Sequence, residues 1–286
     1  MDSYTPNVTQ HIEALGGWVS VGYIGVVTSS LLLCLYMYNV FIFIKKNPSW
    51  ARRHQAWITS LPMAISFISL ASFFVPRATI MCETIKFIYM SFIMVQFFET
   101  VIVIGGGEEV LLRVQNGNKW YVITFSLFCK QLQFIQFNIT KNRLRIIGGL
   151  IYQAFVSQLI LTFIVAILEI AEVLRRDTGD AIFRFFLILN VLSSTLGLVF
   201  FNALNVGLSA HLNSNWPKFT KKYYALFYFI CVQRAHSLFI SVFNLFNVES
   251  PILTWTTIDA AASMLEAFIF GIVFFLFFKV VVVKLD

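Results

Sequence analysis

Charged and polar side chains occur inside the long apolar stretches of this sequence, where an ionisable group needs a partner, a cavity or a ligand to offset its desolvation. Residues 256–278 contain Asp259, Ser263 and Glu266 at positions i, i+4 and i+7. This spacing places all three side chains on one face of a helix. The pattern suits a polar pathway, or a site for an amphipathic solute, between the helices of a membrane protein.

Two other apolar stretches, residues 85–104 and 224–246, carry further candidates for this site. They are Gln96, Glu99, Gln233, Arg234 and His236. Arg234 is the one Arg or Lys deep in a predicted span, so we expect its charge to face Glu266, Glu99 or the anionic head of a solute. The 32 phenylalanines of the chain would then cover an apolar body.

Hydrogen bonding between packed helices is the competing interpretation of these polar residues. It is the simpler account of the serines, the asparagines and Gln158, and of the single His236. For Arg234 and Glu266 we favour a functional role, because each places a charge deep in a predicted span.

Catalytic and metal-binding motifs are missing from the sequence. There is no HExxH, no GxSxG and no Cys–His pair at a plausible membrane surface, and the four cysteines are scattered without metal-type spacing. We therefore expect no enzyme activity, no metal and no cofactor.

The composition indicates a membrane protein. Of 286 residues, 58% are hydrophobic and only 12% are charged, about half the charge of a typical soluble domain. The mean hydropathy is +0.79. The net charge of +7 comes from short basic clusters between apolar runs. That arrangement favours membrane topology over nucleic-acid binding.

Seven apolar runs are long enough to cross about 30 Å of hydrocarbon as helices. We predict an all-α, single-domain bundle whose spans are residues 19–44, 57–75, 85–104, 150–170, 185–207, 224–246 and 256–278. Fifteen of the 21 Lys and Arg residues fall on one side, among them Lys45, Arg145 and Lys222, and five on the other, including Lys86. The richer side is expected to be cytoplasmic, so the N-terminus lies outside and the C-terminus inside.

Residues 105–148 are predicted to form a cytoplasmic connection at the membrane interface. Within it, Trp120 to Phe137 is as long as a span but is interrupted by lysine and glutamine, so we expect it to lie on the bilayer face. Cys129 in this segment is a candidate for S-acylation, with an unmodified thiol as the alternative. Asn7 belongs to an Asn-Val-Thr sequon that an outside N-terminus would expose to glycosylation.

The stretch VIVIGGGEEVLLR marks a corner of the chain rather than a phosphate loop. It lacks Gly-Lys-Ser/Thr, and its two carboxylates would repel phosphate. The glycines permit a tight turn, and Glu108 and Glu109 are expected in the first turn of a new helix, where acidic residues favour its dipole.

A Pro-Arg pair closes the second predicted span, and an aromatic-rich third span leads into Gly-Gly-Glu-Glu. These residues are Pro76, Arg77, Gly106, Gly107, Glu108 and Glu109. The runs KNRLRIIGGLIYQAF and KKYYALFYFICVQ, and Glu266 in the last span, continue the pattern. Together they resemble the organic solute transporter alpha-subunit family and its related seven-span proteins, from about residue 57 to 278.

This resemblance implies facilitated diffusion of amphipathic organic anions, such as steroid conjugates and bile-acid-like molecules, across a plasma membrane. It also implies a small single-span beta subunit, with a homo-oligomer as the alternative, and assigns Gln233 and Glu266 to family positions. A seven-span receptor is a second possibility, although an Asn-Pro-x-x-Tyr motif is missing. A third is a protein that organises membranes or regulates trafficking without transport.

Overall fold

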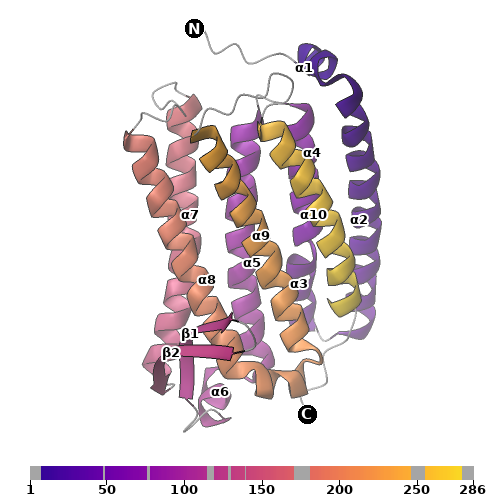
Figure 1. Cartoon of the computed structure of the whole chain (residues 1–286). Helices are drawn as coiled ribbons and strands as arrows, with labels where there is room; N and C mark the ends of the chain where they lie inside the picture. Colours follow the sequence, from indigo (N-terminus) through magenta and orange to yellow (C-terminus); the bar gives the residue numbers. More distant parts are fainter. Residues whose placement is uncertain are drawn as a thin grey trace.

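The chain forms a bundle of helices that run side by side along one axis (Figure 1). This computed structural model describes residues 8–47, 49–75, 78–114, 119–127, 130–138, 140–170, 181–245 and 255–278. The helices are α1 (Val8–Leu15), α2 (Val19–Lys46), α3 (Ser49–Thr59), α4 (Leu61–Phe74), α5 (Thr79–Ile104), α6 (Glu108–Val114), α7 (Lys141–Ile170), α8 (Ala181–Asn215), α9 (Phe219–Leu245) and α10 (Trp255–Phe278). A single 3-10 turn, Gly16–Trp18, joins α1 to α2.

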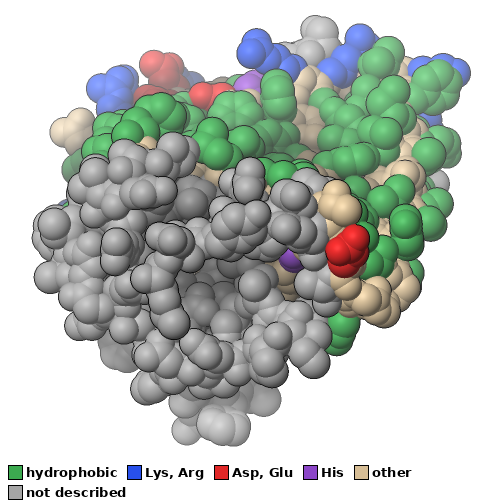
Figure 2. All heavy atoms as spheres, turned by 90° about the horizontal axis from the view of Figure 1, so that it is seen from above, with side chains coloured by type: hydrophobic (Ala, Val, Ile, Leu, Met, Phe, Trp, Pro, Cys, Tyr) green, Lys and Arg blue, Asp and Glu red, His purple; other side chains and the backbone are tan. Residues whose placement is uncertain are grey.

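Five helical stretches in the described part are long and apolar enough to cross a membrane. They are Gly16–Lys46, Ala51–Phe74, Met81–Ile104, Lys141–Ile164 and Thr257–Phe278. Within α8, residues Thr195–Ser209 form a shorter apolar stretch. Viewed from above in Figure 2, the described surface is largely hydrophobic and its charged side chains occupy small areas. An apolar exterior around membrane-length helices is the pattern of an integral membrane protein.

Several helices extend beyond the spans predicted for them. Helix α7 begins at Lys141, although the predicted span begins at residue 150, and α5 begins six residues before residue 85. The second predicted span, 57–75, is covered by α3 and α4, which meet at Ser60. The hydroxyl of Ser60 is hydrogen-bonded to that of Tyr89 on α5. Hydropathy marks the hydrocarbon boundary, whereas a helix continues until its backbone is capped.

The described part of the connection between α5 and α7 contains the exception to the helical fold. Strands β1 (Lys119–Leu127) and β2 (Lys130–Asn138) pair antiparallel, with Lys119 opposite Asn138 and Leu127 opposite Lys130. The hairpin lies against α8 (Figure 1). It departs from the expectation of a purely helical chain, and Cys129 lies outside the described residues.

The glycine corner forms as predicted. Gly106 and Gly107 have φ of 88° and 90°, in the left-handed region that favours glycine. The Gly107 amide donates to the carbonyl of Ile102 at 2.9 Å, which closes the end of α5. Helix α6 then begins with Glu108 and Glu109 in its first turn.

Aromatic rings fill the bundle toward the end where α9 begins. Phe97 of α5 is fully buried, and its ring centroid lies 5.4 to 6.2 Å from those of Phe201, Trp216, Phe219 and Tyr223. Such ring pairs contribute beyond their buried area. This packing ties α5, α8 and α9 together at that end of the bundle.

Candidate functional site

A buried ion pair connects α5 to α10. The ammonium of Lys86 lies 3.4 Å from Oδ2 of Asp259, and the two side chains are 4% and 8% exposed. Lys86 also donates to the hydroxyl of Ser263 at 3.3 Å. Charge counting along the sequence treated Lys86 as a topology signal for the outer side and not as a site residue. In the structure, a carboxylate and a hydroxyl on α10 compensate its charge within the bundle.

Glu266 lies two turns further along the same face of α10. Its Oε2 accepts a hydrogen bond of 2.8 Å from Gln233 of α9. The His236 ring nitrogen Nδ1 lies 3.4 Å from Asp259 Oδ1 and 3.7 Å from Glu266 Oε1. His236 therefore lies between two carboxylates. Gln233, His236, Asp259 and Glu266, all selected from the sequence, come together in one cluster.

Arg234 points from α9 toward α5 and α7. Its guanidinium donates to Gln158 Oε1 at 3.0 Å and to Ser91 Oγ at 3.4 Å. It also lies 4.4 Å from the centroid of the Phe87 ring, a cation–π distance. Gln158 is itself fully buried and donates to Thr162 at 2.6 Å. The hypothesised ion pair between Arg234 and Glu266 is not formed in this structure.

The polar cluster lies where the backbone of α9 is distant from the backbones of α5 and α7. Helix α9 packs closely against α8 and α10 but much less closely against α5 and α7. The long Arg234 side chain bridges that distance. Within the described residues, Arg234 Nε is buried without a hydrogen-bond partner. Buried polar atoms are rarely left unpaired, so Arg234 has capacity to bind a further polar group.

Gln96 and Glu99 form a second, separate cluster on α5. Glu99 is eight residues from Ser91, the residue of α5 that Arg234 contacts, which is about 12 Å along a helix. Glu99 accepts a hydrogen bond from Tyr152 and one of 3.4 Å from Gln96, whose oxygen lies 3.0 Å from His54. His54 and Glu99 are 3.8 Å apart. The two candidates therefore lie away from Arg234, and Glu99 does not pair with it.

Lys86 was not predicted as a site residue, and Gln158 was predicted to have a packing role. A signal for Lys86 was present, because it is the second residue of the predicted span 85–104 and Asp259 offers an opposite charge on another span. Pro76, Arg77 and Asn7 lie outside the described residues. Glu108 lies 3.7 Å from Arg145, at the corner and away from the charged cluster.

Membrane-length helices that enclose a charged network define an integral membrane protein with a polar interior. The chain belongs to the organic solute transporter Ostalpha family, whose family model matches residues 21–282. No curated protein and no solved structure matches it. The family resemblance noted in the sequence is confirmed. Membership implies solute transport, and the family is one of membrane transporters and not an enzyme class.

Proposed function

We propose that the chain carries amphipathic organic anions, such as steroid conjugates and bile-acid-like molecules, across the plasma membrane by facilitated diffusion. The proposal rests on the surroundings of Arg234. Its hydrogen-bond partners, Gln158 and Ser91, are neutral, and no carboxylate of the described residues lies within ion-pair distance of it. A guanidinium held by neutral groups keeps a positive charge that an anionic head group can approach.

The surroundings of Arg234 suit an amphipathic anion. The face of Phe87 offers apolar and cation–π contact next to the charge. Lys86 is compensated by Asp259, so it adds less attraction for an anion than Arg234 does. The sulfate or carboxylate of the solute would bind Arg234, while its apolar body would contact Phe87 and neighbouring aromatic rings.

The proposed topology has seven spans, with α8 and α9 added to the five stretches above, an outside N-terminus and a cytoplasmic C-terminus. The basic residues at the end of α2 and the start of α7 support this orientation, because Lys and Arg favour the cytoplasmic side. Glycosylation of Asn7 in cells, detected as a mobility shift on enzymatic deglycosylation, would test the outside placement. An unshifted wild-type chain that becomes glycosylated only at a sequon added to the C-terminus would contradict it.

A steroid sulfate uptake assay tests the transport proposal. The purified chain is reconstituted into lipid vesicles, either alone or together with a candidate single-span beta subunit. Uptake of labelled steroid sulfate is then measured for the wild type and for Arg234→Ala. We expect uptake by the wild type and a loss of about tenfold or more in Arg234→Ala, since a charge-assisted hydrogen bond contributes roughly 1.5–3 kcal/mol.

Arg145→Ala is the matched control, because Arg145 is exposed and paired with Glu108 away from the cluster. Normal uptake by a well-folded Arg234→Ala chain would overturn the proposed role of Arg234. Ligand-stimulated G-protein coupling in cells, with no uptake, would favour the receptor alternative. A homo-oligomer that transports without the second subunit would remove the need for a beta partner.

A further inference from the structure

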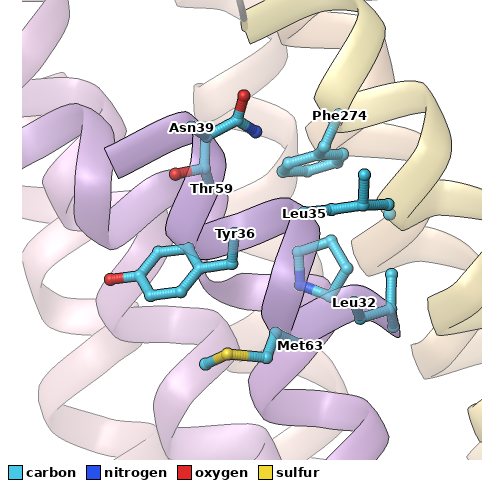
Figure 3. A pocket seen from close by; sticks show the side chains of 9 residues that line it. Leu32, Leu35, Tyr36, Asn39, Thr59, Met63 and Phe274 are labelled. Carbon is cyan, nitrogen blue, oxygen red and sulfur yellow. The ribbon is translucent and has the colours of Figure 1, made fainter. Parts of the chain in front are cut away.

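A small pocket lies beside the break in the second span. Helices α3 and α4 meet at Ser60 and together form the membrane-length stretch Ala51–Phe74. Thr59 is eight residues from Ala51, so the break is about 12 Å along the helix from that end, within the hydrocarbon. The pocket lies between α2, α4 and α10 and has room for about one water molecule. Figure 3 shows Asn39 and Thr59 near one end of it.

Pro62 removes one backbone hydrogen bond at this break. Proline has no amide hydrogen, so Pro62 cannot donate to the carbonyl of Ile58, four residues earlier, as another helical residue would. Pro62 also lines the pocket. Because hydrocarbon offers no donor, a span tolerates a proline where neighbouring side chains or ordered water molecules satisfy the polar groups around it. The break is therefore a place where a span favours an ordered water molecule.

Two side-chain acceptors line the pocket and lack a donor between them. Asn39 is 3% exposed, and its Oδ1 has no hydrogen-bond partner in the described structure. The Thr59 hydroxyl donates its hydrogen to the carbonyls of Gln55 at 2.8 Å and Ala56 at 3.2 Å. It therefore has no hydrogen left for Asn39, but its oxygen can still accept one. An amide oxygen in an apolar environment is costly unless a donor reaches it, so a molecule with two donors would suit both groups.

We propose that this pocket binds one ordered water molecule, which donates one hydrogen to Asn39 Oδ1 and the other to Thr59 Oγ1. Water matches the size of the pocket and supplies the two donors that these oxygens lack. A sodium ion also binds oxygen ligands, but none of the residues described as lining the pocket carries a charge that would compensate it. The water molecule links α2 to the broken turn of the second span. This site is separate from Arg234 and does not depend on the transported solute.

Radiolytic footprinting tests the proposal directly. The full-length chain in phosphatidylcholine nanodiscs receives a short X-ray pulse, which makes hydroxyl radicals from water in place, bound water included, and mass spectrometry identifies the oxidised side chains. Met63 lines the pocket, and methionine reacts readily with these radicals. We expect more oxidation of Met63 than of Met90, which is fully buried and does not line the pocket, or of Met37, which is exposed within the span Gly16–Lys46. After rapid mixing with heavy-oxygen water, Met63 should acquire the heavy isotope more slowly than a methionine peptide free in the same solution.

Asn39→Leu removes one acceptor and should lower the oxidation of Met63 about fivefold or more. Asn205→Leu is the matched control, because Asn205 is also buried, its Oδ1 also lacks a partner in the described structure, and it does not line the pocket. Its Met63 oxidation should equal that of the wild type. Thr59→Val, which keeps the side-chain shape and Asn39, should also lower it and covers the case in which Asn39→Leu fails to fold.

Four results would overturn the proposed water site. They are oxidation of Met63 no higher than that of Met90, isotope uptake as fast as in the free peptide, wild-type oxidation of Met63 in a folded Asn39→Leu or Thr59→Val chain, and a Met63 signal that disappears when choline replaces sodium in the buffer. The last result would assign the pocket to a cation.

Discussion

Lys86 and Asp259 are 173 residues apart in the sequence and 3.4 Å apart in the structure, where both charged groups are buried. Each group is costly to desolvate, and their mutual attraction offsets that cost only while both are present. The pair therefore links α5 and α10 near the ends at which both helices begin. Arg234, in the neighbouring part of the cluster, has no carboxylate of the described residues within ion-pair distance.

Removing one partner of this pair should destabilise the protein more than removing both. Lys86→Met leaves Asp259 buried without its cation, and we expect a loss of about 3 kcal/mol or more in the free energy of unfolding. The double variant Lys86→Met/Asp259→Leu should recover most of that loss. Thermal unfolding of the three purified proteins in one detergent measures both effects. A double variant less stable than Lys86→Met would show that the pair does not act as a unit.

Gln158 should act on transport by holding the Arg234 guanidinium. Gln158→Leu removes the 3.0 Å hydrogen bond, and we expect KM for steroid sulfate uptake to rise about tenfold as Arg234 loses its fixed orientation. The control is Gln153→Leu on the same helix, because Gln153 is exposed. Unchanged KM in Gln158→Leu, with normal folding, would contradict the positioning role of Gln158.

The sequence predicted the helical character of each span and gathered four members of the charged cluster. The spacing of Asp259, Ser263 and Glu266 was sufficient for the members on α10, because a helix puts i, i+4 and i+7 on one face. Lys86 was missed because charge counting treats a lysine near a span end as a topology signal. Only the structure, which brings the ends of the two side chains within 3.4 Å, shows that its partner is Asp259.

The hairpin was missed for a different reason. Gln131, Leu132, Gln133 and Phe134 alternate between polar and apolar residues, and the preceding run is rich in β-branched and aromatic types. Both features favour strands. The high overall hydropathy of the segment led instead to the prediction that it lies on the bilayer face. Partner choice within the bundle, such as Gln158 for Arg234 instead of Glu266, depends on how far apart the helices lie, which the pattern of one helix does not contain.

Phe97 should be one of the most sensitive apolar positions in the chain. It is fully buried against four rings, so Phe97→Ala leaves a cavity where α5, α8 and α9 meet. We expect a loss of about 3–5 kcal/mol in unfolding free energy. Phe163→Ala on α7 is the comparison, because Phe163 is 55% exposed and its removal creates no internal cavity. Similar unfolding midpoints for the two variants would contradict the central position of Phe97.

Gly106 should tolerate substitution poorly for a backbone reason. At φ 88° an added Cβ is strained, and it would lie 3.1 Å from Val110 Cγ1 on α6. We expect Gly106→Ala to lower the unfolding free energy by about 1–2 kcal/mol. Gly149→Ala is the matched control, because Gly149 lies inside α7, has no heavy atom within 4 Å of its added Cβ, and should gain slightly from a better helix former. The two thermal unfolding midpoints should therefore move in opposite directions. If the midpoint of Gly106→Ala is at or above that of the wild type, the corner does not require the left-handed conformation.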